Sequence, residues 1–392
     1  MLSINKSIFG LIFLIGLASP FIFWNEKAVF VAVFLIPFVF YRKSIYSIFS
    51  STNKFVFLIF FVLFYLSVFL PFRPYSDFRF YNAIVAIGSI FVFFIGFKER
   101  RDILDGYITF MSWVSLGAIL SFILFILKIP FPSVEISNEA RDDHTYLYFA
   151  TLYMDSQVNV FSGITFTRVN GVFKEPGHFG VFLSIAFSLI QKPLSSKRGK
   201  TILLGSLVTL SAATYLLIMV SLLIKYFRPK YTIYFSLFVS LLFLLSFIPT
   251  IQSLFDYYFL SKVSSEEGLL DGRTRNAGLY LSFLPNFYDY FIGTNNDFLI
   301  NIARVTSDYR RIIYDSGYLV VIMSFILFLV FTVSSLKNRN LLLLNIILVL
   351  FLTLLHRSWF FYQGFFWFFV AIILAIIADN KKTQIKENFI FY

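Results

Sequence analysis

The stretch Arg168–Gly180, which reads R-V-N-G-V-F-K-E-P-G-H-F-G, holds the side chains of this chain best suited to chemistry. Arg168, Glu175 and His178 stand where a polar segment runs back into an apolar one. An arginine can hold a phosphate, and a glutamate or a histidine can accept a proton. Charge kept against hydrocarbon is costly and marks a functional site. The alternative is that Glu175 and Pro176 only begin a helix, which leaves Arg168 and His178 unexplained.

A second group of charged side chains lies further along the chain, between two apolar regions. A guanidinium is a permanently charged planar fork that matches phosphate oxygens. The turn Asp271–Arg275 sets two such forks before the aromatic segment 279–288, which is too short to span a membrane and is expected at the height of lipid head groups. Each arginine alone could bind anionic lipid or a neighbouring acid, but their clustering predicts recognition of a lipid-linked pyrophosphate. The members of this group are Arg273, Arg275, Arg304, Arg310 and Arg311.

His356 and Arg357 stand at the end of the apolar segment 340–356. One interpretation is an interfacial anchor beside Trp359 and Tyr362. The other is a third side of the site, with an imidazole that titrates near neutral pH.

No metal site or cofactor is expected. The chain has no cysteine, and its three histidines have no ligand spacing between them. Asp142-Asp143-His144 is interpreted as solvated loop charge. Because no Gly-rich phosphate loop is present, neither ATP nor NAD is implied.

Composition indicates the elements that must position these residues. Of the 392 residues, 58% are hydrophobic, 14% are charged and 56 are Phe, with a mean hydropathy of +0.80. A soluble domain of this size cannot hide so much apolar surface. We therefore expect an all-α polytopic membrane protein in which residues 1–392 form one membrane domain.

The net charge of +12 does not indicate nucleic-acid binding, because it follows the sides of a membrane. Connections rich in Lys and Arg are expected in the cytoplasm; they are Lys6, 42–54, 98–101, 192–200, 225–230, 337–339 and 381–386. This asymmetry predicts cytoplasmic termini and about twelve transmembrane helices. The predicted spans are 7–24, 28–41, 55–72, 79–97, 106–127, 173–190, 201–211, 213–225, 231–250, 316–336, 340–356 and 359–378.

Segment 201–225 is long enough for one helix, yet basic clusters bound it on both sides. We predict two short or broken helices that turn within the polar run 209–214, near the outer face. The two outer connections 128–172 and 251–315 are much longer than the others, and loops of that size are usually functional.

Five short motifs follow one another on the expected outer side: R-x-x-G with E-P-G at 168–177, T-L-S at 209–211, G-R-T at 272–274, F-I-G-T-N at 291–295 and D-S-G at 315–317. In order and sidedness they resemble the motifs of the O-antigen polymerase and ligase superfamily, the Wzy and WaaL type proteins. The arginine that often follows the T-x-S serine in that family is absent here.

The resemblance implies a GT-C-like, metal-independent glycosyltransferase of the bacterial inner membrane. Such enzymes move a glycan from undecaprenyl pyrophosphate to an acceptor hydroxyl at the periplasmic face. Their expected partners are the lipid-linked oligosaccharide, membrane lipid, and a chain-length regulator and flippase of the same pathway. The residues implied for donor binding are Arg168, Arg273, Arg275, Arg310, Arg311 and Asp315, and those implied for catalysis are Glu175, His178 and His356.

Two alternatives remain open. Ligases of the superfamily usually carry a His-Asn pair where this chain has Tyr314-Asp315, which favours a polymerase. A lipid-linked oligosaccharide flippase needs charge along a pathway between two similar halves, and the sequence contains no such repeat.

Overall fold

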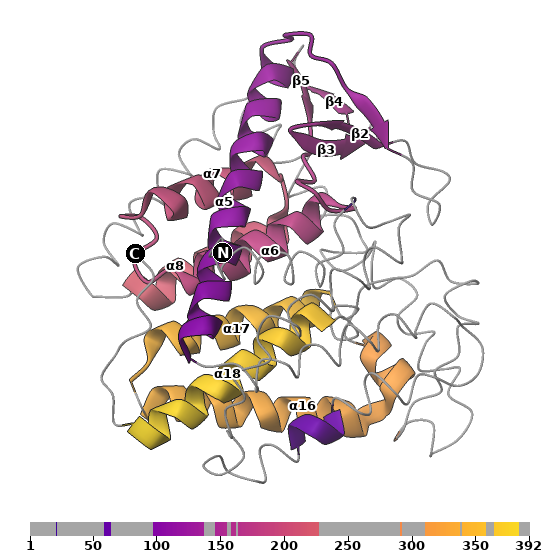
Figure 1. The fold of residues 1–392 in the computed structure, drawn as a ribbon. Coiled ribbons are helices and arrows are strands. Elements are labelled where there is room, and N and C mark those ends of the chain that lie inside the picture. Colours follow the sequence, from indigo (N-terminus) through magenta and orange to yellow (C-terminus); the bar gives the residue numbers. More distant parts are fainter. Residues whose placement is uncertain are drawn as a thin grey trace, which may run out of the picture.

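The computed structural model describes residue 21 and residues 59–63, 97–136, 146–154, 158–161, 164–226, 291, 310–337, 339–357 and 364–383. This part of the chain is mostly helical (Figure 1). All or most of five predicted spans lie outside it, namely 7–24, 28–41, 55–72, 79–97 and 231–250.

Two of the described helices are long and apolar enough to cross a membrane. Their apolar segments are Arg100–Ile126 in α5 and Ser316–Lys337 in α16. Apolar segments too short to pass that test occur in α6, α8, α17 and α18. Length and composition are thus compatible with a helical membrane protein. The described helices are α5 (Phe97–Ile126), α6 (Pro176–Leu189), α7 (Lys197–Val208), α8 (Ala212–Tyr226), α16 (Arg310–Lys337), α17 (Leu341–His356) and α18 (Gly364–Thr383).

Helix α5 begins earlier than the predicted span 106–127, and the supposed basic connection 98–101 forms its first turn. Further along α5, Asp105 pairs with Arg198 of α7 at 2.7 Å, and Arg198 also donates to Thr109 Oγ1 at 3.0 Å. Charged residues thus join α5 to α7 instead of forming a loop.

The predicted division of segment 201–225 is confirmed: α7 ends at Val208 and α8 begins at Ala212. Between them Leu210 adopts a left-handed backbone conformation with φ 49°. At 1.5 Å per residue, α7 and α8 are about 18 and 22 Å long, so neither crosses a hydrocarbon layer of about 30 Å alone.

Helix α16 contains a break at Gly317, with φ 78° and ψ 169°. A left-handed φ is costly for residues with a side chain, so glycine suits the bend. The D-S-G motif therefore joins a short helical piece, Arg310–Ser316, to the apolar remainder of α16.

The prediction of an all-α protein was wrong for segment 128–172, because its described part contains β-strands. β1 (Val134–Ile136), β2 (Tyr146–Phe149) and β3 (Thr151–Met154) form an antiparallel sheet in that order, and β4 (Val158–Phe161) pairs with β5 (Ile164–Thr167). Val134 lies opposite Tyr148 and Leu147 opposite Tyr153. The strands are short and rich in aromatic and β-branched residues, which favour extended structure.

The strands lie at the C-terminal end of α5 (Figure 1). Ser121 of α5 donates a hydrogen bond to the carbonyl oxygen of Phe149 at 2.6 Å. A side chain at Gly117 would overlap the backbone of Ala150, so the glycine lets the turn between β2 and β3 approach the helix.

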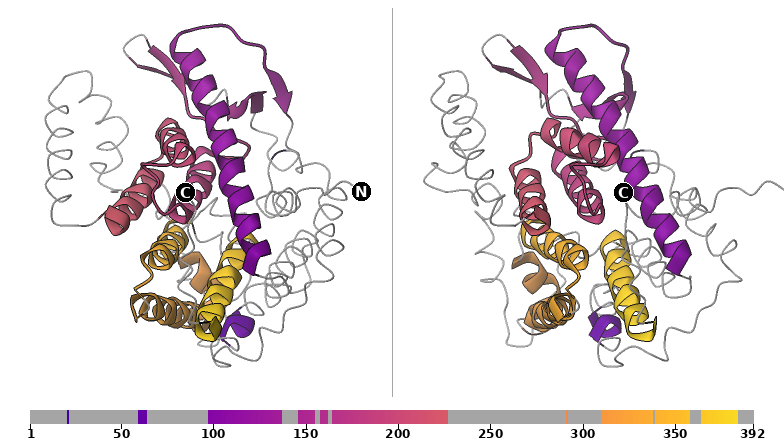
Figure 2. Two further views of the ribbon diagram at one scale, coloured as in Figure 1. Left: turned by 60° about the vertical axis from the view of Figure 1, so that its left-hand side comes forward. Right: turned by 90° about the vertical axis from the view of Figure 1, so that its left-hand side faces the viewer.

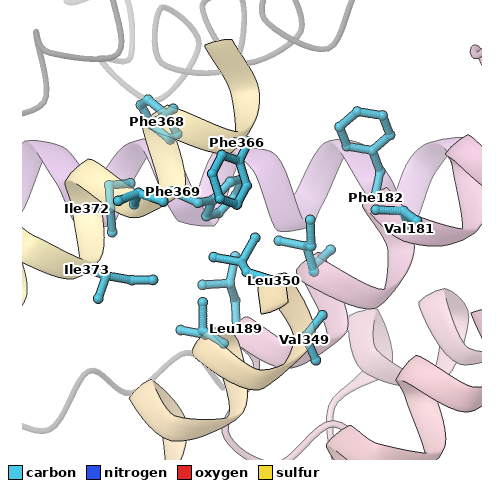
Figure 3. Packing of buried hydrophobic residues seen from close by; sticks show 14 of the residues in the cluster. Val181, Phe182, Leu189, Val349, Leu350, Phe366, Phe368, Phe369, Ile372 and Ile373 are labelled. Atoms are coloured by element: carbon cyan, nitrogen blue, oxygen red, sulfur yellow. The ribbon is translucent and has the colours of Figure 1, made fainter. Parts of the chain in front are cut away.

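Helix α6 is the central helix of the described region. It contacts α5, α7, α8 and α17 (Figure 2), and His178 is its only residue that is not buried. Figure 3 shows Phe182 and Leu189 of α6 in the same apolar cluster as Leu350 of α17 and Phe369 of α18. A helix that is apolar on all sides is a core helix, so its N-terminus is a rigidly held place for a site.

Candidate functional site

The R-V-N-G segment is tied to β3 before it enters α6. Leu152 N donates to Gly171 O at 2.6 Å, and Asn170 N donates to Leu152 O at 2.8 Å. The Thr151 hydroxyl adds a hydrogen bond to the same Gly171 oxygen at 3.2 Å. The sheet in segment 128–172 therefore holds the motif that contains Arg168.

Gly171 directs the chain into α6. Its φ is 63°, and a Cβ at this position would lie 2.6 Å from the ring of Phe179. Both observations explain a glycine here, because a side chain would be strained and would meet the ring. Beyond it, Asn170 Nδ2 and the Tyr146 hydroxyl donate to Lys174 O at 3.2 and 3.3 Å.

Glu175 occupies the N-cap position of α6, but its side chain makes no capping hydrogen bond. The carboxylate instead accepts from Nη1 of Arg357 at 2.8 Å. Arg357 directly follows α17, where its own N–H closes the helix on Thr353 O at 2.7 Å. The pair thus links the start of α6 to the end of α17, and capping does not account for the carboxylate.

The burial of this pair is uneven. The Arg357 side chain is 5% exposed and that of Glu175 is 29% exposed. The Nε atom of Arg357 is buried and has no hydrogen-bond partner in the described structure. A buried guanidinium depends on its carboxylate, because an uncompensated buried charge is strongly destabilising.

The glycine of E-P-G makes room for this pair. A Cβ at Gly177 would overlap Nη2 of Arg357. Pro176 suits the first helical position, where no N–H is needed. The motif therefore combines a carboxylate, a helix start and a space for a guanidinium within three residues.

His178 lies one turn into α6. Its Nε2 is 3.6 Å from Oε2 of Glu175, the oxygen that also accepts from Arg357, and its side chain is 13% exposed. Arginine, carboxylate and imidazole therefore meet at one oxygen atom.

Arg168 lies at the break between α7 and α8. Its Nε donates to Thr209 O, the C-cap carbonyl of α7, at 3.4 Å. A cation at a helix C-terminus interacts favourably with the dipole. The arginine whose ion pair with Glu175 the structure describes is Arg357.

No protein-family model, curated protein or solved structure matches this chain. The likeness to the polymerase and ligase superfamily therefore stays a resemblance of short motifs. Function must be argued from the geometry of the site.

The other predicted site residues are described only in part. Arg310, Arg311 and Asp315 lie in the short helical piece before the break of α16, and His356 is the last residue of α17; the structure describes their backbone and not their side chains. Arg273 and Arg275 lie outside the described residues. Within the described ranges, no three His, Cys, Asp or Glu side chains gather in a way that could hold a metal ion.

The contact between Arg357 and Glu175 was not predicted from the sequence, which left His356-Arg357 as either an interfacial anchor or a third side of the site. One signal was available: a lone arginine at the end of an apolar helix needs a counter-charge. Glu175, at the start of another apolar helix, was a candidate partner.

Proposed function

We propose that this chain is a metal-independent membrane glycosyltransferase that polymerises lipid-linked oligosaccharide repeat units. The donor is a glycan on undecaprenyl pyrophosphate, and the acceptor is a lipid-linked repeat unit at the periplasmic face of the bacterial inner membrane. The product is an O antigen, a capsule or an exopolysaccharide.

One observation carries this proposal. Glu175 and His178 at the start of α6 meet Arg357 at the end of α17, while Arg168 lies at the α7–α8 break. Transfer of a glycosyl group from a pyrophosphate needs cations for the leaving group and a base for the acceptor hydroxyl. Candidates for the base lie at the start of α6, and Arg168, a candidate cation for the leaving group, lies between α7 and α8, which both pack against α6.

The order of the motifs supports the same function. The predicted T-x-S turn does separate two short helices, and D-S-G does bend the start of α16. In the proposal, Arg273, Arg275, Arg310 and Arg311 join Arg168 in holding the pyrophosphate, with Asp315 beside them. The remaining partners are membrane lipid, a flippase and a chain-length regulator.

The decisive experiment supplies purified protein in lipid vesicles with synthetic lipid-linked repeat units. A polymerase forms products longer than the input, without ATP or a divalent cation. Failure to elongate the correct repeat unit, where a known polymerase elongates its own, would rule the proposal out. Deletion in the native host separates the alternatives. A polymerase deletion leaves single repeats on the final acceptor, a ligase deletion leaves long polymer on the carrier lipid, and a flippase deletion traps single units in the cytoplasm.

The proposed topology has about twelve spans with both termini in the cytoplasm and segments 128–172 and 251–315 in the periplasm. Because the chain has no cysteine, single cysteines can be labelled without background. An impermeant maleimide should label intact cells at Ser137→Cys or Ser265→Cys. Labelling at Ser195→Cys would show that the orientation of the chain in the membrane is the opposite of the proposed one.

A further inference from the structure

The two groups at the start of α6 that can accept a proton, Glu175 and His178, differ in how protonation would affect their neighbour Arg357. Arg357 is buried and Glu175 is its described counter-ion. A proton on Glu175 would take away the charge that compensates the buried guanidinium, which is strongly unfavourable. A proton on His178 would instead place an imidazolium beside a carboxylate, which is favourable. His178 is therefore the better proton acceptor of the two.

The position of the imidazole agrees with this choice. Nε2 lies 3.6 Å from Oε2 of Glu175, just beyond hydrogen-bonding distance, so a small approach of the two groups would form a hydrogen bond. A neutral histidine that holds its proton on Nε2 carries its lone pair on Nδ1. A carboxylate fixed on one ring nitrogen thus determines which nitrogen is basic.

His178 is the only residue of α6 that is not buried. Its side chain is 13% exposed and that of Glu175 is 29% exposed, so both groups can be reached, as a proton acceptor must be. The choice between them therefore rests on the buried charge of Arg357.

We propose that Arg357, Glu175 and His178 act as one unit, in which Arg357 fixes the Glu175 carboxylate, the carboxylate holds the proton on Nε2, and Nδ1 of His178 is the general base. This assignment rests on the proposed function. The acceptor hydroxyl oxygen forms a bond to the anomeric carbon of the donor sugar as the bond from that carbon to the pyrophosphate oxygen breaks. The bonding electron pair leaves with the lipid pyrophosphate. The hydroxyl proton passes to Nδ1, and the resulting imidazolium later releases a proton to water. Arg357 and Glu175 are positioning residues.

The kinetic test uses purified protein in vesicles with lipid-linked repeat units. His178→Gln keeps an amide near the position of Nε2 but has no base, so kcat should fall about 100-fold or more with KM little changed. Glu175→Gln should also reduce kcat, and Arg357→Lys should reduce it about 10-fold because lysine keeps the charge and loses the fork. Asp105→Asn, which removes the charge of the other described arginine–carboxylate pair, is the matched control and should leave kcat unchanged.

The second test measures the ring itself and needs no substrate. The chain has three histidines, so 15N-histidine NMR in lipid nanodiscs gives three pairs of ring-nitrogen signals, and the pair lost in His178→Gln belongs to His178. At a pH where the ring is neutral, wild type should show the Nε2–H tautomer. Glu175→Gln should shift it toward a mixture, and Asp105→Asn should not. This readout separates orientation from a merely structural role.

The two tests fail differently. If wild type elongates its substrate and His178→Gln keeps kcat within about 10-fold, the imidazole is not the base. If the tautomer of His178 is the same in Glu175→Gln, the carboxylate does not orient the ring. If wild type does not elongate the correct repeat unit, the proposed function fails, and the role of His178 as its base fails with it; the NMR result then still decides whether Glu175 holds the ring.

Discussion

Two arginine–carboxylate pairs of nearly equal length lie in different surroundings in this protein. Arg198 and Asp105 are 2.7 Å apart, and their side chains are 30% and 45% exposed. Arg357 and Glu175 are 2.8 Å apart, but the arginine is only 5% exposed. An exposed pair contributes about 0–1 kcal/mol, whereas breaking a buried pair costs about 3–5 kcal/mol. Distance alone does not distinguish the two; burial does.

The two pairs also differ in their further partners. Arg198 and Asp105 join α7 to α5, and Thr109 takes part in the same contact. Arg357 and Glu175 join the end of α17 to the start of α6, and the further neighbour there is His178. An imidazole can exchange a proton near neutral pH and a threonine hydroxyl cannot, so the proposed catalytic role falls on the buried pair.

The largest expected difference follows from removing each carboxylate. Glu175→Ala should lower the free energy of unfolding by about 3 kcal/mol, because it removes the carboxylate that pairs with the buried guanidinium of Arg357. Asp105→Ala should lower it by less than about 1 kcal/mol. Reversible unfolding in mixed detergent micelles measures both. Equal losses in the two variants would show that burial does not set the difference.

A somewhat smaller effect is expected at the glycine that accommodates the guanidinium. Gly177→Ala should cost about 1–3 kcal/mol, because its Cβ overlaps Arg357 and the side chain must move. Adding Arg357→Lys should relieve part of this loss, since the ammonium group is narrower. Gly180→Ala, which meets Thr214 instead, is the control and should gain nothing from Arg357→Lys. Additive losses in the Gly177→Ala double variant would contradict the described contact.

Replacing the whole buried pair should dissociate stability from activity. The double variant Glu175→Leu with Arg357→Met leaves no buried charge without a counter-ion, so its free energy of unfolding should return to within about 1 kcal/mol of wild type. Elongation of lipid-linked repeats should still be reduced to the level of Glu175→Gln, because His178 has lost the group that orients it. Recovery of elongation in this folded variant would assign the pair to stability alone.

The smallest effect is expected at a buried hydroxyl that lies outside both pairs. Thr214 Oγ1 is buried against Gly180 and has no hydrogen-bond partner in the described structure. Thr214→Val should therefore change the free energy of unfolding by less than about 0.5 kcal/mol, or raise it, because no hydrogen bond is lost. A loss comparable to that of Glu175→Ala would mean that this hydroxyl has a partner.

Several features of the fold were predictable from the sequence. Apolar runs predicted α6 and α17 within a few residues, and the polar residues at 209–211 predicted the break between α7 and α8. The strands β1–β5 were missed because short aromatic runs have no clear period and were assigned to a loop. The early start of α5 was missed because its basic first turn resembled a cytoplasmic connection.

The site was predicted less completely. Glu175 and His178 were predicted from their position in the polar stretch before an apolar helix, and the structure brings them together. Their partner Arg357 was not predicted, because a single sequence does not show which two helix ends meet. The need for a glycine at position 177 was not predicted either, because it depends on the guanidinium of Arg357, which lies at the end of another helix.

The ion pair between α6 and α17 also has a consequence for biosynthesis, because its two members are 182 residues apart in the chain. At roughly 5–20 residues per second, the ribosome needs roughly 10–40 s to pass from one to the other. Throughout that interval the growing chain contains Glu175 but not Arg357. A product released before residue 357 cannot form this ion pair, so the contact between the start of α6 and the end of α17 is a late step in the assembly of the fold.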